Sequence, residues 1–317
     1  MQRSTILSHP PQRHRPQRAT AVATGAATAL LLLAAAAIPA GLAAVERLRP
    51  QYDSIRTRNS LQADVMVYTP TVGAVAGPAI VYFSGNWGWR PIMQDTASHL
   101  AANGRYVLGI DSMKYFGKML DAGEWKRDLT TFRSYINEKA GKPPDAPVIL
   151  IGFTYGAEMI PYMLNRGGIE GIAGALLIGP GDTGSVLCRL DLQLKLEIPE
   201  EERFDVGREL ADLPSLPIVL IEGTLDEDSK ARDLLPLVKT PRRYAPIVGG
   251  DRQFSETRDV YFEYTAQAID WIDSTARSPE AAAPAAPGAD APADDGAPAP
   301  GEPADGAEPG TGSAPDG

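Results

Sequence analysis

The sequence predicts an α/β fold in which helices cover both faces of a mostly parallel sheet. Between residues 47 and 276, short apolar runs alternate with amphipathic stretches, as strands and helices do in such folds. One run, residues 148–153 (VILIGF), is apolar throughout, which is typical of a central strand that is buried on both faces. The region shows no internal repeat, so one such sheet would account for it as a single domain.

The individual elements are predicted from two kinds of pattern. Continuous apolar runs indicate strands, and apolar side chains that recur every three or four residues indicate helices. The stretch 182–214 has no clear period, and we interpret it as a candidate cap over a site at the carboxyl ends of the strands. We expect strands at residues 63–68, 79–83, 106–110, 148–153, 173–178, 218–221 and 244–248, and helices at 91–102, 124–139, 157–165 and 254–272.

The two ends of the chain differ from this body, which we place at residues 46–277. Residues 1–18 carry four arginines and no acid, and residues 19–45 carry no charge. This order predicts that residues 1–45 are an export signal, or alternatively an uncleaved membrane anchor. Either interpretation puts the body outside the cytoplasm. Residues 278–317 consist mainly of Ala, Pro, Gly, Asp and Glu, which predicts a disordered acidic tail that acts as a spacer or has no specific role.

Charge and cysteine content exclude several classes of function. The formal net charge of −10 divides into +4 for residues 1–18, −8 for residues 279–317 and −6 for the remainder. A mildly acidic body argues against nucleic-acid binding. Cys188 is the sole cysteine, which excludes an intramolecular disulfide framework and a multi-cysteine metal cluster. We predict no cofactor and no metal site.

One motif is typical of a catalytic nucleophile. Gly152-Phe153-Thr154-Tyr155-Gly156 follows the run at 148–151 and opens a helical segment. This is the context of the nucleophile elbow G-x-S-x-G, in which glycines permit a tight strand-to-helix turn and the helix N-terminus stabilises negative charge. Thr154 occupies the central position in place of serine. It is either a nucleophile, since a threonine hydroxyl can act as one, or a structural threonine at a strand end.

A nucleophile of this kind needs an acid and a base after it in the chain. Asp226 is the first candidate acid and Asp228 the alternative, because both follow the strand expected at 218–221; a solvated acidic loop is the other interpretation. No histidine stands where the base is expected. His9 and His14 lie in the predicted export segment, and His99 lies inside an expected helix, where a structural role is the usual one. Asp251 could replace the base only if burial raised its pKa.

At these residues the sequence resembles the bacterial virulence protein family of VirJ and the C-terminal half of AcvB, which are exported proteins of the α/β-hydrolase fold. The resemblance covers roughly residues 79–271. Its segments, in order, are Ser84-Gly85-Asn86-Trp87-Gly88-Trp89, Asp111-Ser112-Met113-Lys114-Tyr115-Phe116, Gly152 to Pro161 with Asn165 and Arg166, and Gly249-Gly250 with Phe254.

The resemblance implies an envelope protein that faces the periplasm, in a family associated with virulence and type IV secretion. Some members hydrolyse aminoacylated phosphatidylglycerol, which implies a pocket for a phospholipid headgroup or an acyl ester. Gly85 and Asn86 would then lie by the oxyanion hole, and Lys114 would be a cation for phosphate or else a surface lysine. We expect the binding site to include Ser84, Gly85, Asn86, Trp87, Lys114 and Tyr155.

The sequence departs from the family pattern at the positions that would carry out catalysis. The family's aspartate in the first loop is Asn86, its serine is Thr154, and its histidine position carries Asp251 or Arg252. The expected framework residues remain. Our main hypothesis is therefore an exported α/β-hydrolase-like protein with impaired catalysis, which binds a lipid or a protein instead. The alternatives are an active esterase or lipid hydrolase that uses Thr154, and a non-catalytic scaffold for envelope or secretion proteins.

Overall fold

The computed structural model describes residues 50–56, 62–71, 73, 77–189, 194, 197–239 and 241–278. All of them belong to one compact unit. The predicted export signal or anchor over residues 1–45 lies outside the described residues, as does the predicted tail apart from Ser278. Among the helices that the structure describes, none is long and apolar enough to cross a membrane.

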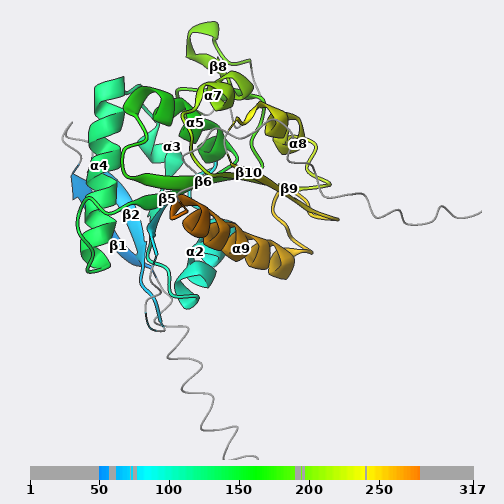
Figure 1. The fold of residues 1–317 in the computed structure, drawn as a ribbon. Helices are drawn as coiled ribbons and strands as arrows, with labels where there is room; N and C mark the ends of the chain where they lie inside the picture. Colours follow the sequence, from blue (N-terminus) through cyan, green and yellow to red (C-terminus); the bar gives the residue numbers. More distant parts are fainter. Residues whose placement is uncertain are drawn as a thin grey trace, which may run out of the picture. The chain divides into compact units, whose positions relative to one another are not determined.

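A twisted sheet forms the centre of the fold (Figure 1). Within the described residues it has eight strands, and the pairings are parallel except those of β2 with β1 and with β4. The predicted, mostly parallel α/β architecture is confirmed. The strands, in spatial order, are β1 (Gln51–Arg56), β2 (Gln62–Tyr68), β4 (Val107–Ile110), β3 (Ala79–Phe83), β5 (Val148–Phe153), β6 (Ile172–Ile178), β9 (Ile218–Gly223) and β10 (Arg242–Ile247).

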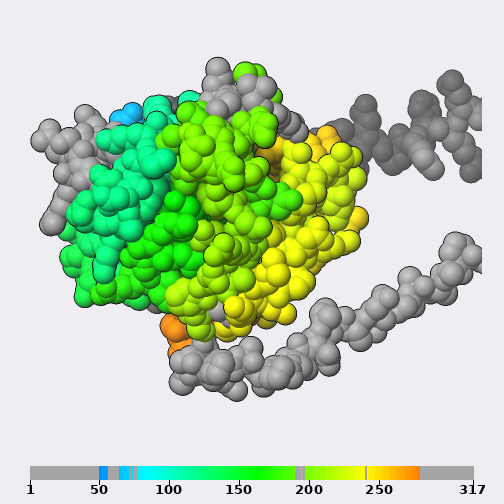
Figure 2. Space-filling view, turned by 90° about the horizontal axis from the view of Figure 1, so that it is seen from above, coloured from blue at the N-terminus to red at the C-terminus, as the bar shows by residue number. Residues whose placement is uncertain are grey.

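Helices cover both faces of this sheet (Figure 1). One face carries α2 (Pro91–Ala102) and α9 (Arg258–Ala276), and the other carries α4 (Ala122–Lys139) and α5 (Tyr155–Gly167). Figure 2 looks down on this second layer, which continues into the segments coloured light green and yellow. These segments contain β7 (Thr183–Ser185), η1 (Glu200–Glu202), β8 (Arg203–Asp205), α7 (Val206–Asp212), α8 (Ala231–Leu234) and η2 (Leu235–Leu237); the short α3 (Ser112–Tyr115) follows β4.

The hydrophobic core is divided by the sheet into two clusters. Successive side chains of a strand point to opposite faces. In β3, Val81 and Phe83 therefore pack against the α4 and α5 side, whereas Ile80 and Tyr82 pack against the α2 and α9 side. All four are fully buried. A strand that is apolar at every position is thus explained by helices on both of its faces.

The expected strands and helices are all found, with bounds that agree to within a few residues. The short elements α3, β7, β8, α7 and α8 were not expected, and two further differences have a clear physical reason. β1 was not expected, because QYDSIR contains few apolar residues and only Ile55 of it joins the core. The last helix begins at Arg258 and not at Phe254. Phe254 has a φ of 51°, in the left-handed region, and its ring stacks on Tyr261 at 4.3 Å. A residue with this φ cannot continue a right-handed helix, so the chain turns there first.

Candidate functional site

The structure places Thr154 at a sharp turn between β5 and α5. Its φ of 46° and ψ of −110° make it, with Phe254, one of two described non-glycine residues with a positive φ. The strained turn is held from both sides. The Thr154 N–H donates to the Ile178 carbonyl of β6 at 2.7 Å, and its carbonyl accepts from the N–H groups of Ala157 and Glu158. This is the conformation of a nucleophile elbow, kept although the serine is replaced.

The two glycines of the motif are required by close packing. A Cβ atom on Gly152 would lie 2.5 Å from backbone atoms of Ala157, and one on Gly156 would lie 2.5 Å from the carbonyl oxygen of Phe83. Side-chain carbon atoms are not found this close to backbone atoms, so neither position accepts a larger residue without movement of the turn. The glycines thus let α5 approach the end of β3.

The loop after β3 lies against the Thr154 hydroxyl. A Cβ on Gly85 would be 2.6 Å from Thr154 Oγ1, so the predicted proximity of this loop to the elbow is found. The Ser112 N–H donates to Ser84 Oγ at 2.9 Å, which ties the loop to α3. Tyr155 opens α5, and its N–H therefore has no acceptor within the helix. The elbow N–H and the β3 loop are the two parts from which an oxyanion hole is built in this fold.

The Asp111 side chain has a structural role in the second segment of the resemblance, residues 111–116. Its carboxylate caps α3 by accepting a hydrogen bond from the Lys114 N–H. The same carboxylate lies next to Gly88, where an added Cβ atom would be 3.0 Å from Asp111 Oδ1. Gly88 has a φ of 73°, which favours glycine. The two loops therefore lie against each other at Gly88 and Asp111, with little room there for a larger residue than glycine.

The predicted acid Asp226 lies close to the elbow. The Gly179 Cβ position would be 3.4 Å from Asp226 Oδ2 and 3.7 Å from Thr154 Cγ2, so both side chains border the same position beside Gly179. Burial raises the pKa of Asp226 above its ordinary value, while Arg252 acts in the opposite direction. Asp228, the alternative acid, instead forms an ion pair with Arg252 at 2.6 Å. Of the two candidates, the structure brings Asp226 to the elbow.

The position expected for a base carries no group with the needed properties. Asp251 Oδ1 accepts from the backbone N–H groups of Gln253 and Ser255, and these hydrogen bonds lower the Asp251 pKa. The condition for a catalytic Asp251, a pKa raised by burial, is therefore not met. Arg252 pairs with Asp228. His99 stacks on Phe262 of α9 at 5.1 Å, which confirms its structural interpretation.

One titratable residue near the elbow was not predicted. Glu158 follows Thr154 by one turn of α5, and burial raises its pKa to about 7. Its Oε1 accepts from the Gly181 N–H at 3.1 Å, and Arg252 and Asp182 face it with opposite effects on the pKa. A helical side chain leans toward the helix N-terminus, which is the elbow. The signal in the sequence was one acid inside the otherwise uncharged stretch 155–165.

Three of the remaining residues that were predicted to bind a ligand have different surroundings. Trp87 is 54% exposed at the tip of the β3 loop, where it is accessible to a ligand or surface. The Lys114 ammonium forms an exposed ion pair with Asp64 at 3.4 Å, which favours the surface interpretation over a phosphate site. The Tyr155 ring is buried against Phe116, so this side chain belongs to the core. The binding roles of these residues stay predictions.

The segment predicted as a cap does contact the site loops. The Cys188 N–H donates to the Phe116 carbonyl at 2.9 Å, and Cys188 Sγ lies 3.7 Å from the Asn86 carbonyl oxygen. Within the described residues, no group of histidine, cysteine and acidic side chains is arranged to hold a metal ion.

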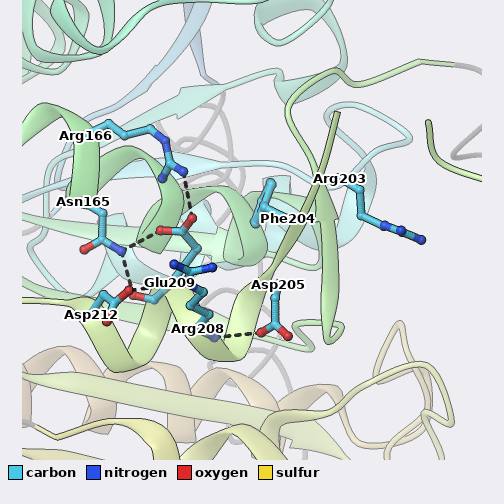
Figure 3. Close-up of a pocket in the computed structure, with 8 residues that line it drawn as sticks. All are labelled: Asn165, Arg166, Arg203, Phe204, Asp205, Arg208, Glu209 and Asp212. Atoms are coloured by element: carbon cyan, nitrogen blue, oxygen red, sulfur yellow. Dashed lines mark hydrogen bonds and ion pairs between the residues drawn. The ribbon is translucent and has the colours of Figure 1, made fainter. Parts of the chain in front are cut away.

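The cap is joined to α5 by a polar clamp (Figure 3). Asn165 Nδ2 donates to the Glu209 side chain at 2.6 Å, and the Arg166 guanidinium donates to the same carboxylate at 2.9 Å. Both residues belong to α5 and Glu209 to α7, and their side chains converge at an open cavity of about 690 Å³. The Asn-Arg pair of the resemblance therefore holds the cap in place.

The order of the sheet, the elbow and the adjacent β3 loop define a protein of the α/β-hydrolase class. Residues 78–238, just over half of the chain, match the family VirJ, described as bacterial virulence protein. The chain therefore belongs to the VirJ family, as the resemblance implied. No curated protein matches the sequence.

Solved structures share this fold at low identity. The α/β-hydrolase GrgF from Penicillium sp. sh18 is 13% identical with a TM-score of 0.54, over 71% of this chain and 99% of GrgF. A membrane phospholipase A, described as a bacterial virulence factor, is 14% identical with a TM-score of 0.52, over 79% and 96%. Est1E from Butyrivibrio proteoclasticus is 9% identical with a TM-score of 0.51, over 71% and 99%. These likenesses establish the fold alone.

Proposed function

We propose that this protein is an exported VirJ-family protein of the bacterial envelope that binds a phosphate or ester group at its elbow without hydrolysing it. The observation that carries the proposal is the ion pair of Arg252 with Asp228 in the loops where the catalytic base and its acid belong. A guanidinium stays protonated at physiological pH, so Arg252 cannot accept the proton of a nucleophile.

The elbow retains the features that bind an anion or a polarised carbonyl. The N–H of Tyr155 opens α5, and a helix N-terminus attracts negative charge. Gly85 brings backbone against the Thr154 hydroxyl, and Arg252 adds a positive charge that acts on both Asp226 and Glu158. These features support binding of a phospholipid headgroup or an ester. His99 is the one histidine among the described residues, and it stacks on Phe262 of α9, so no imidazole there serves Thr154, which supports impaired hydrolysis.

The test of catalysis is covalent labelling of the exported full-length chain with a fluorophosphonate probe, together with hydrolysis of a short-chain nitrophenyl ester. We expect no labelling, and ester turnover equal to that of Thr154→Ala, because the base position of the fold carries Asp251 and Arg252 in place of a histidine. An active serine esterase in the same experiment shows that the probe works. Labelling of the wild-type chain that disappears in Thr154→Ala would overturn the proposal.

A second candidate function is supported by Glu158. A carboxyl group with a pKa of about 7 is matched to proton transfer at neutral pH, and Glu158 lies one turn from Thr154. In this alternative, Glu158 takes the Thr154 hydroxyl proton as the oxygen attacks an ester carbonyl; the ester C–O bond then breaks, Glu158 returns the proton to the departing alcohol, and water hydrolyses the acyl-threonine. The same labelling experiment separates the two functions: a loss of labelling in both Thr154→Ala and Glu158→Gln would establish the alternative.

Export is tested by fusing the chain to a phosphatase that is active only outside the cytoplasm. We expect activity with residues 1–45 present and at least a tenfold loss when residues 19–45 are deleted, because the uncharged run directs export. The matched control deletes residues 279–317 and keeps the activity. Equal activity without residues 19–45 would contradict the proposed location.

A further inference from the structure

Several large apolar side chains are exposed at one edge of the sheet. In the part of the chain that the structure describes, nine such side chains are exposed. Four of them, Trp87, Met113, Leu225 and Val248, lie shortly after the carboxyl ends of β3, β4, β9 and β10. The other five lie elsewhere in the chain and are Tyr52, Met119, Leu194, Leu237 and Val260.

These exposed tips flank the elbow on both sides. The carboxyl ends of parallel strands meet at the same edge of a sheet, and β5, which carries Thr154, lies between β3 and β9 in the strand order. On the β9 side, the Leu225 N–H donates to the Gly250 carbonyl at 2.9 Å, which brings Leu225 beside the loop of Val248. On the β3 side, Gly88 lies next to the Asp111 carboxylate, so the loop that carries Trp87 adjoins the segment that leads to Met113.

The exposure of these side chains is large. Trp87 is 54% exposed, Leu225 65% and Val248 84%, although such residues lose free energy when they face water. They stand on separate loops and so do not form the walls of one groove. Separate apolar tips around a site suit a fluid apolar layer, which adapts to each of them. Tryptophan is also the side chain that favours the interface between lipid and water.

Three cations of the strand-end loops and the cap are paired within the protein. Arg252 pairs with Asp228 at 2.6 Å, and Arg189 with Glu202 at 2.6 Å. Lys114 pairs with Asp64 at 3.4 Å. Paired charges offer no strong field to a partner of one sign, and the body as a whole is mildly acidic, which opposes an anionic surface. The charge pattern therefore fits a zwitterionic lipid surface.

We propose that the edge of the sheet that carries the elbow docks on a phospholipid bilayer with zwitterionic headgroups, with Trp87, Leu225 and Val248 inserted into the interface. This rests on the proposed location outside the cytoplasm. Docking through this edge brings Thr154 to the headgroup layer, where a phosphate or ester group is available to the elbow. The surface is defined by its apolar tips and does not depend on hydrolysis.

Tryptophan fluorescence tests this contact in the full-length chain. The chain has four tryptophans, and none lies within residues 1–49 or 279–317, so quenching reports on the body. Vesicles of brominated phosphatidylcholine quench a tryptophan only where it reaches the lipid. We expect quenching of the wild-type emission, with at least half of the quenched signal removed in Trp87→Phe. An export segment that holds the protein at the bilayer would not by itself quench Trp87.

The variants separate the docking surface from general hydrophobicity. Leu225→Ser with Val248→Ser keeps Trp87 and should reduce its quenching at least threefold, since two apolar tips are lost. The matched control, Tyr52→Ser with Leu237→Ser, removes two exposed apolar residues outside this edge and should leave the quenching unchanged. Thr154→Ala should also leave it unchanged, so failure of the proposed ligand binding is distinguished from failure of docking.

Two results would overturn the proposal. One is emission from Trp87 that brominated lipid does not quench. The other is equal quenching in the Leu225→Ser, Val248→Ser variant and the wild-type chain. Loss of a co-purifying protein in that variant, without any lipid quenching of the wild-type chain, would assign the edge to a protein partner instead.

Discussion

A Gly156→Ala variant is expected to lose about 3 kcal/mol of unfolding free energy. The added Cβ would lie 2.5 Å from the Phe83 carbonyl oxygen and 2.7 Å from that of Ser84. Both oxygens belong to backbone at the end of β3, which cannot rotate away as a side chain could. The loss is measured by urea unfolding, with the mid-point expected to fall while the slope stays the same.

The matched control for this variant is Gly117→Ala. A Cβ there would lie 3.4 Å from the Lys114 carbonyl oxygen, which is an ordinary contact. Its effect should stay within about 0.5 kcal/mol, as for most surface substitutions. If Gly156→Ala were as stable as the control, the close approach of the elbow to β3 would be wrong.

The stability of a Glu158→Gln variant is expected to depend less on pH than that of the wild-type chain. Burial raises the Glu158 pKa from 4.5 to about 7 in the folded state. The folded chain therefore holds this proton more tightly than the unfolded chain does. The stability that the protonated group contributes is complete below pH 4.5 and is lost as the pH rises through 7. The full loss is at most about 3 kcal/mol.

Glutamine keeps the acceptor for the Gly181 N–H and never ionises. The unfolding free energy of the variant, relative to that of the wild-type chain, should therefore rise by up to about 3 kcal/mol from pH 5 to pH 8. Unfolding by urea at both pH values gives the difference. In the control, Glu170→Gln, the altered side chain is 82% exposed, and its pH profile should run parallel to that of the wild-type chain. Parallel profiles for Glu158→Gln as well would contradict a Glu158 pKa near 7.

Local patterns in the sequence predicted most of the fold. The apolar runs of β3 and β5 and the helical pattern of α2 predicted these elements with the same bounds, because burial on both faces or on one stripe is encoded residue by residue. β1 could not be predicted in this way. It is an edge strand held by its pairing with β2, and its polar, mostly exposed residues QYDSIR leave little apolar signal in the sequence.

The site was predicted in part for a related reason. The elbow at Thr154 depends on five consecutive residues, so its geometry could be expected from them. The properties of the other residues depend on distant partners. Lys114 pairs with Asp64, fifty residues earlier, and the Glu158 pKa depends on burial and on Arg252. Asp251 is a turn residue because the backbone folds around its carboxylate. Such partners become visible only in three dimensions.

The helix α5 has a consequence for how the cap and the elbow move. Its first residue follows Thr154, and its last turn holds Glu209 of α7 through Asn165 and Arg166. Thirteen residues span about 20 Å, with the cap attached at one end and the strained turn at the other. Pro161 lies inside this helix, where a proline removes one backbone hydrogen bond and favours a bend. The cap and the elbow thus share one mechanical connection, and Pro161 is the point at which that connection can flex.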